Sequence, residues 1–121
     1  MLEMSMNEAV MNLSTHKKND VGVVTVDADR IDAAVAIQFK DHMRETLADA
    51  RGRFVLDLQH VSFIDSSGLG AIVAAMKLMP QGSKLELAGL SPAVDKVFRM
   101  TRMDSIFAIH PSAEAACTAP A

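Results

Sequence analysis

Three consecutive polar residues, Asp65, Ser66 and Ser67, are the part of the sequence best suited to carry chemistry. They precede an apolar run, and Asp or Ser at such a boundary is typical of a helix N-cap. The first backbone N–H groups of a helix lack intrahelical partners and, with the positive end of the helix dipole, favour negative charge. A phosphate on this triplet would be tolerated there. A plain helix cap is the commoner explanation, so the pattern alone leaves both open.

Two glycines, Gly68 and Gly70, follow the triplet. Inside a helix each costs about 1 kcal/mol relative to alanine, so their presence predicts that another backbone, or a partner protein, approaches closely. Helix-to-sheet packing would also explain them. Just upstream, we expect Val61, Phe63 and Ile64 to be buried in the core.

Other chemistries find less support. The four histidines and the single cysteine share no metal-ligand spacing, so we expect no metal site; they are His16, His42, His60, His110 and Cys117. A serine hydrolase is disfavoured because Gly-x-Ser-x-Gly is absent and no His/Asp pair can be placed beside Ser66. We therefore expect no catalytic residue and no cofactor.

A phosphoaspartate receiver is a further alternative, because Asp27 and Asp29 follow a predicted strand and Asp57 lies in a later one. We place Asp57 inside its strand rather than at the end, and no strand-ending Lys-Pro is found. Both features disfavour a receiver.

Composition narrows the class of protein. The chain has 121 residues and a net charge of −3, which argues against a nucleic-acid binder that neutralises phosphates. One cysteine and an acidic N-terminus without signal-peptide features predict a cytoplasmic protein. The longest apolar-rich stretch, residues 66–76, is about half of the ~20 residues that cross a bilayer, so no membrane insertion is expected.

Periodicity predicts the elements that position the triplet. Strands are expected at residues 21–26, 54–58, 84–88 and 106–109, with a weaker one near 9–15 that forms a hairpin across 17–20. A first helix should begin at an Asp32 cap and end near Gly52. Its expected inward residues are Ala36, Phe39, Met43, Leu47 and Ala50.

A second helix should stop before Pro80. Its expected inward residues are Leu69, Ile72, Val73, Met76 and Met79, and we assign Met43 and Met76 to the core. Ser91 and Pro92 should open a third helix with Val94, Val97 and Phe98 inward. Ser112 should cap a short fourth helix.

Strands that alternate with helices predict one α/β domain with a mostly parallel sheet, an N-terminal hairpin and about four helices. Functional groups of such sheets usually lie in loops past the carboxyl ends of the strands. The loop after Leu58, which leads to the triplet, is the one expected to carry function.

Residues 63–70, Phe-Ile-Asp-Ser-Ser-Gly-Leu-Gly, resemble the signature of the bacterial anti-sigma-factor antagonists, which are stand-alone STAS domains of the sporulation type. The resemblance extends through residues 31–34, 55–58 and 90–98. It implies a STAS-type fold over residues 8–117, with an N-terminal extension at 1–7 and a tail at 118–121.

The resemblance also implies a function without enzymatic activity. The unphosphorylated form would bind an anti-sigma factor that is also a serine kinase and free a sigma factor; phosphorylation on Ser66 would break the complex, and a metal-dependent serine phosphatase would restore it. The partner surface would contain five residues, Asp32, Asp65, Ser67, Gly68 and Leu69. The alternative is a STAS binding module of another system, namely a lipid-transport complex, a stressosome-like assembly or a two-component output pathway.

One segment departs from the family pattern. Asp29 and Arg30 stand where many members have Gly-Glu before the Leu-Asp pair. We therefore expect the first interface loop to be shaped and charged differently here.

Overall fold

The computed structural model describes residues 12–48 and 51–119, and within these ranges five strands form the main sheet. Their spatial order is β1 (Asn12–Lys18), β2 (Val21–Asp27), β4 (Arg53–Asp57), β6 (Lys84–Ala88) and β7 (Ile109–His110). β1 is antiparallel to β2, and the other neighbours are parallel. A separate parallel pair joins β3 (Arg30–Ile31) to β5 (Phe63–Ile64). The predicted α/β class with an N-terminal hairpin is confirmed.

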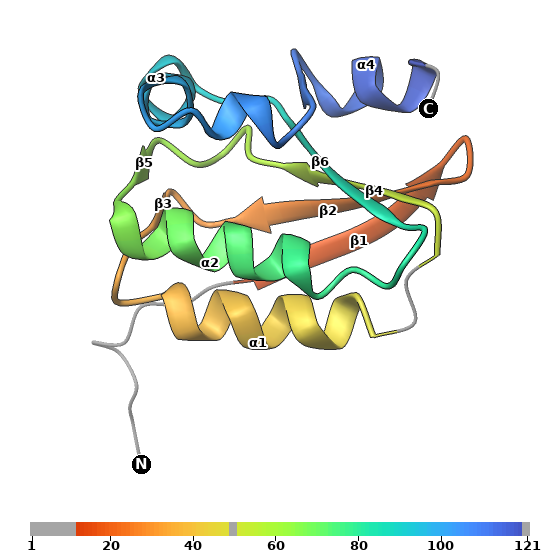
Figure 1. Ribbon diagram of the computed structural model, residues 1–121, viewed down its shortest axis with the longest axis horizontal. Coiled ribbons are helices and arrows are strands. Elements are labelled where there is room, and N and C mark those ends of the chain that lie inside the picture. The colour runs from red at the N-terminus through yellow and green to blue at the C-terminus, as the bar shows by residue number, and fades with distance from the viewer. Residues whose placement is uncertain (1–11, 49–50, 120–121) are drawn as a thin grey trace.

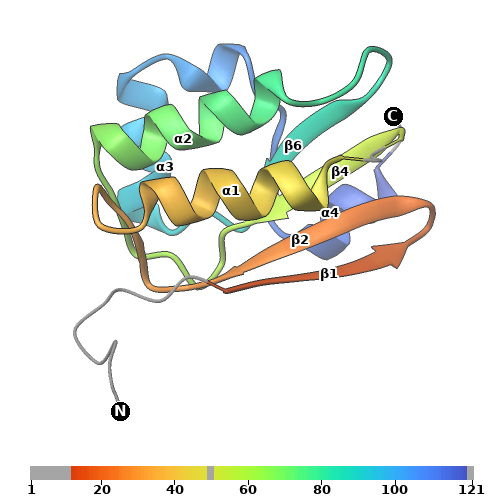
Figure 2. The ribbon, with the colours of Figure 1, turned by 90° about the horizontal axis from the view of Figure 1, so that it is seen from below.

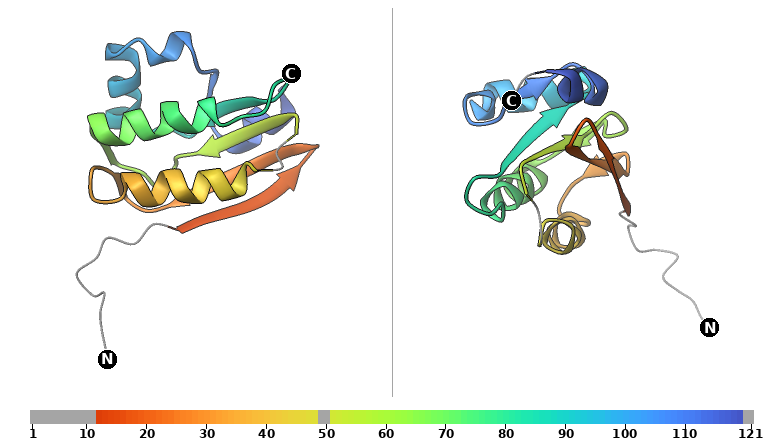
Figure 3. Two further views of the ribbon diagram at one scale, coloured as in Figure 1. Left: turned by 60° about the horizontal axis from the view of Figure 1, so that its bottom comes forward. Right: turned by 90° about the vertical axis from the view of Figure 1, so that its right-hand side faces the viewer.

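Helices cover both faces of the main sheet. They are α1 (Ala36–Thr46), α2 (Ser66–Lys77), α3 (Pro92–Met100) and α4 (Ala113–Thr118), with a short 3₁₀ turn, η1 (Met103–Ser105). α1 and α2 lie side by side on one face, as Figures 1 and 2 show, and α4 lies on the opposite face (Figure 3). None of the helices in the described ranges is long and apolar enough to cross a membrane.

The larger core lies under α1 and α2. Phe39 and Met43 of α1 and Ile72 of α2 are fully buried against alternate residues of the strands, of which Leu56 is one. Phe98 of α3 belongs to the same core and packs edge-on against Phe107, with ring centroids 6.2 Å apart. Because side chains on a strand alternate between faces, the same strands present a second set to α4.

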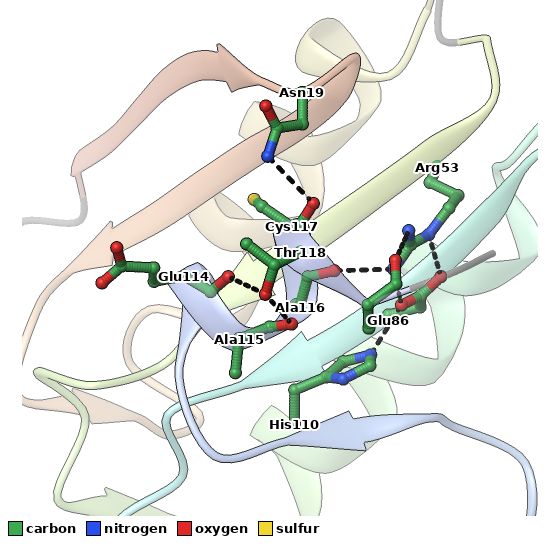
Figure 4. A network of polar contacts seen from close by, with 10 residues as sticks. Asn19, Arg53, Glu86, His110, Glu114, Ala115, Ala116, Cys117 and Thr118 are labelled. Atoms are coloured by element: carbon green, nitrogen blue, oxygen red, sulfur yellow. Dashed lines mark hydrogen bonds and ion pairs between the residues drawn. The ribbon is translucent and has the colours of Figure 1, made fainter.

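α4 is held to the second face by a buried ion pair (Figure 4). The Nε and Nη2 groups of Arg53 donate to the two carboxylate oxygens of Glu86 at 2.7 Å each, and Nη1 and Nη2 also donate to the carbonyls of Ala119 and Ala116 at 3.0 Å. His110 Nε2 lies 2.7 Å from Glu86 Oε1. The hydrogen bonds from Arg53 make the largest contribution, and together with the contact from His110 they hold the pKa of Glu86 below its usual range, although burial acts in the opposite direction.

The hairpin differs from its prediction in register. β1 extends through Lys17 and Lys18, which were expected in the turn, and the connection contains only Asn19 and Asp20. Both have positive φ, 53° and 64°, as a two-residue type I′ turn requires. The tight turn at Asn19 and Asp20 therefore leaves both lysines in the strand, although their polarity had suggested a loop. Their side chains are exposed to solvent on an edge strand. Residues 9–11 of the predicted strand lie outside the described ranges.

The first helix is shorter than predicted. Asp32 does not cap it, since α1 begins at Ala36 with Val35 as N-cap. Instead, the Asp32 carboxylate accepts from the Ala34 N–H at 3.0 Å and its carbonyl accepts from the Val35 and Ala36 N–H groups, which makes a turn ahead of the helix. The helix ends at Thr46, and Gly52 (φ +76°) precedes β4.

The inward face of α1 is confirmed: Ala36, Phe39, Met43 and Leu47 are buried. The fifth predicted member, Ala50, lies outside the described residues.

The predicted inward face of α2 is confirmed only at Ile72, which is fully buried, and the other buried residues of the helix are Gly68, Ala71 and Ala75. The predicted Leu69, Val73 and Met76 are partly buried at the margins of this face, as is Met79 beyond the end of the helix. The small residues take the central positions because α1 lies directly alongside. Assignment of Met43 to the core is confirmed, but Met76 is only half-buried and lines an open groove of about 440 Å³ with Met79 and Leu85.

In the C-terminal third of the chain, the helices begin where the predicted N-caps place them. Ser91 accepts from the Val94 N–H with Pro92 at the first helical position, and Ser112 accepts from the Ala115 N–H, so both predicted caps are confirmed. Val94 and Phe98 are buried as predicted, and Val97 is half-buried. The last strand is present, but its predicted bounds, 106–109, are wrong: β7 contains only Ile109 and His110. The N–H groups of Ile106 and Phe107 donate to the Met103 carbonyl of η1, and Phe107 turns into the core, so these residues do not pair in the sheet.

Candidate functional site

The candidate site lies past the carboxyl ends of β2 and β4, at the end of the molecule where β3, β5 and the first turns of α1 and α2 meet (Figure 1). β3 and β5 pair in parallel with Arg30 beside Phe63 and Ile31 beside Ile64. The Ser62 N–H and hydroxyl both donate to the Asp29 carbonyl, at 2.8 and 3.0 Å. The loop after Leu58 is therefore fixed against the loop after β2, as expected for functional loops of a parallel sheet.

Asp65 ties the two loops together. As the N-cap of α2, it accepts from the Gly68 N–H through Oδ1 at 2.9 Å, which confirms that the triplet caps this helix and assigns the cap to Asp65 and not to Ser66. Its other oxygen, Oδ2, accepts from the Ala33 N–H at 3.3 Å, and its own N–H donates to the Ile31 carbonyl at 3.4 Å. One side chain thus fixes the start of α2 and the segment before α1.

Ser66 and Ser67 are the first two residues of α2, and both are exposed. The Ser66 hydroxyl has no hydrogen-bond partner among residues 12–48 and 51–119, so its oxygen is available to a reagent from solvent. The adjacent backbone N–H groups and the helix dipole create a positive local potential. A phosphoryl group on this hydroxyl would meet favourable electrostatics from the helix itself.

The two glycines of α2 have different surroundings. A Cβ on Gly68 would overlap the carbonyl oxygen of Ile31 and would lie 2.8 Å from its carbon and 2.9 Å from Ile64 Cγ1. A Cβ on Gly70 would meet nothing within 4 Å. The predicted close approach of another backbone is therefore confirmed at Gly68, where β3 is the neighbour, and is wrong within this chain at Gly70.

Asp32 and Leu69 complete the set of predicted site residues. Asp32 is half-buried and pairs through Oδ2 with Arg30 Nη1 at 3.3 Å. Leu69 is partly buried against the main core, one turn beyond Asp65. Asp32, Asp65, Ser66 and Ser67 therefore gather on one surface, with Leu69 at its margin and Gly68 buried beneath it.

Sequence reasoning placed Phe63 in the core, and this is wrong. Phe63 is 47% exposed, because the alternation along β5 turns Ile64 inward and its neighbour outward. The guanidinium carbon of Arg30 lies 5.4 Å from the centroid of the Phe63 ring. The only sequence signal for this pair was the departure from the family pattern at Asp29 and Arg30, since two-residue strands have no periodicity to detect.

The residues considered for a receiver do not form an acidic metal site. Asp57 is the last residue of β4, not an interior one as predicted, and it is buried. Its carboxylate accepts from the Gln59 N–H at 3.1 Å and from the Gln59 side-chain amide at 2.7 Å. Within the described ranges, no three His, Cys, Asp or Glu residues come together as they would around a metal ion.

Comparison with known proteins points to one family. Residues 12–116 match the STAS domain. The anti-sigma-B factor antagonist of Listeria monocytogenes is 33% identical over 102 residues, which cover 82% of this chain and 90% of that protein.

Two solved structures share the fold. An anti-sigma factor antagonist from Mycobacterium paratuberculosis has a TM-score of 0.81 at 24% identity and covers 92% of this chain and 96% of its own. The antagonist SpoIIAA in its unphosphorylated form has a TM-score of 0.68 at 21% identity over 88% of this chain and 92% of its own. SpoIIAA of Bacillus has also been solved in a phosphorylated form.

Proposed function

This chain belongs to the STAS domain family, and we propose that within it the protein works as an anti-sigma factor antagonist controlled by phosphorylation of Ser66. Its unphosphorylated form binds an anti-sigma factor and thereby frees a sigma factor. The observation that carries the proposal is the exposed Ser66 hydroxyl directly after the N-cap Asp65, on the surface where two loops of the sheet are fastened together.

The kinase in this proposal is the anti-sigma factor itself, which transfers the γ-phosphoryl group of ATP to the Ser66 oxygen. A metal-dependent serine phosphatase removes the group and returns the antagonist to its binding form. The chain contributes no catalytic group to either reaction and works as a binding module. We place this cycle in the cytoplasm and assign it to the domain spanning residues 8–117, between the short segments 1–7 and 118–121.

The proposed partner surface contains Asp32, Asp65, Ser67, Gly68 and Leu69 together with Ser66. Its rigidity supports this role: Asp65 is held by two backbone N–H groups, and Asp32 by the Ala34 N–H and Arg30. A surface held in this way is organised before the partner arrives, which reduces the entropy lost on binding. Gly68 contributes indirectly, by letting α2 lie against β3.

The switch acts on the interface and leaves the fold unchanged. A phosphate adds about −1.5 to −2 charges at neutral pH, and the start of α2 accommodates them. The partner, in contrast, meets a bulky dianion beside Asp65 and Asp32 where it had met a neutral hydroxyl. A coupling of about 1–3 kcal/mol weakens binding roughly 5–150-fold, which is enough for a switch.

The experiment incubates the chain with the anti-sigma factor kinase of its source organism and ATP, followed by mass spectrometry. We expect one phosphoryl group on Ser66, no incorporation in Ser66→Ala, and normal incorporation in the control Ser83→Ala, whose serine directly precedes β6 at the opposite end of the sheet. Ser66→Asp should lose affinity for the anti-sigma factor with a melting temperature close to that of the wild type. Phosphate on Ser67 alone, or tight binding by the phosphorylated chain, would contradict the proposal.

A further inference from the structure

Among the exposed large apolar side chains of the described residues, Phe63 is the one aromatic ring, and it lies beside the candidate site. The parallel register of β3 and β5 places Arg30 next to it on the same face, while Ile31 and Ile64 are buried on the other. The outward position of Phe63 is thus dictated by the strand pairing. Burying this ring against a partner would remove a large apolar area from water.

The surroundings of Phe63 hold it ready for such a contact. The Arg30 guanidinium lies over the ring at 5.4 Å from the centroid, and Asp32 holds Arg30 through Nη1 at 3.3 Å. Asp32 is itself fixed by the Ala34 N–H at 3.0 Å. These contacts restrict Arg30 and Phe63 before a partner binds. Less conformational entropy is therefore lost on binding, which favours tight association.

The charges around Arg30 and Phe63 indicate which kind of side chain a partner would present to them. The carboxylates of Asp32 and Asp65 already accept from backbone N–H groups, so their charge is partly satisfied within the chain. Arg30 keeps a side chain that is 57% exposed and uses only Nη1 in its bond to Asp32. Its remaining N–H groups are outward donors suited to a carboxylate.

We propose that Arg30 and Phe63 form a docking element that receives a carboxylate side chain with apolar surface beside it on the anti-sigma factor. The inference rests on the proposed function, because it assumes that the partner binds this end of the molecule. Arginine and aromatic residues are the side chains that most often dominate the binding energy of interfaces. The element selects the partner, whereas Ser66 decides when binding occurs.

The test measures the affinity of the purified anti-sigma factor that phosphorylates this chain, by titration calorimetry without ATP. Phe63→Ala and Arg30→Glu should each weaken binding at least about 10-fold, with Arg30→Gln in between. Because the two side chains are stacked, the double variant Arg30→Gln/Phe63→Ala should lose less than the product of the single losses.

Matched controls are available on other surfaces. Ile106→Ala removes an apolar side chain of similar exposure, 48%, and Arg44→Glu reverses an exposed arginine that is likewise paired with an aspartate. Both should bind within twofold of the wild type. Should Phe63→Ala fail to fold, Arg30→Glu decides the question alone.

Two failures can be told apart. Wild-type affinity in Phe63→Ala and Arg30→Glu, combined with loss of binding in Ser66→Asp, would overturn the docking element and leave the proposed function intact. A wild-type chain that neither binds the anti-sigma factor nor is phosphorylated by it would overturn the proposed function and this inference together.

Discussion

Alanine substitutions at the two glycines of α2, Gly68 and Gly70, should change stability in opposite directions, although only one residue lies between them. Gly70 lies at an exposed helical position where an added Cβ would meet nothing within 4 Å. Gly70→Ala should therefore stabilise the protein by the difference in helix propensity, about 0.5–1 kcal/mol. Gly68→Ala gains the same propensity but places a methyl group against the backbone of β3.

The size of the second effect follows from the distances. The Gly68 Cβ would lie 2.8 Å from the Ile31 carbonyl carbon, whereas carbon atoms pack best at about 3.5–4.0 Å, so β3 and α2 must separate by roughly 1 Å. β3 is held by its pairing with β5 and by the Asp65 N–H, and it cannot move as a flexible side chain would. Backbone shifts of this kind cost about 1–3 kcal/mol. The overlap with the Ile31 carbonyl oxygen, a backbone atom, places this cost near the upper end, about 3 kcal/mol. After the gain in propensity, we expect a net loss of about 2 kcal/mol.

Thermal and urea unfolding followed by circular dichroism would measure both variants. At about 4 °C per kcal/mol for a domain of this size, Gly68→Ala and Gly70→Ala should melt about 10 °C apart, on either side of the wild type. Phosphorylation of Ser66 should also slow in Gly68→Ala, because the bond from the Ala33 N–H to Asp65 is disturbed. An equal rise in melting temperature in both variants would refute the assigned contact between Gly68 and β3.

Three further measurements test the packing. By calorimetry, Ile72→Ala should lower the free energy of unfolding by about 2–5 kcal/mol, because it truncates a fully buried side chain. Leu69→Ala should lower the free energy of unfolding less and weaken anti-sigma factor binding more. Equal losses of stability in the two variants would show that Leu69 is only a core residue. Glu86→Gln should destabilise by about 3 kcal/mol at pH 7 because it leaves Arg53 without its charge partner. The pKa of Glu86 is lowered in the folded state, so its carboxylate contributes fully to the free energy of unfolding above its ordinary pKa of 4.5. That contribution is lost as the pH falls through the folded-state pKa. The urea midpoints of Glu86→Gln and the wild type should therefore converge in acid. Asp20→Gly should raise the melting temperature by 1–3 °C or so, because glycine adopts the positive φ of the hairpin turn without strain; a decrease would contradict the assigned turn.

Local chemistry determined much of the fold. Ser91 followed by Pro92 fixed the start of α3, Ser112 fixed that of α4, and alternation identified β6 with its bounds. Asp65 and Ser66 were the predicted candidates for the cap of α2, because a short acceptor side chain before an apolar run can satisfy the free N–H groups of the first turn, and the cap is Asp65. Each of these signals lies within a few neighbouring residues, where sequence order and spatial proximity coincide.

Tertiary structure alone added Arg30 and Phe63 to the surface around Ser66. β3 and β5 are two residues long and gain their order by pairing with each other across 32 intervening positions of the chain, from Arg30 to Phe63. That pairing turned Phe63 outward and brought Arg30 over its ring. The same pairing places the Ile31 backbone so close to α2 that only glycine fits at position 68, whereas a Cβ at position 70 would contact nothing within 4 Å. The sequence by itself located Ser66 at a helix start, but the surface around Ser66 depends on the register of β3 with β5, and two-residue strands are too short for a hydrophobic pattern to encode it.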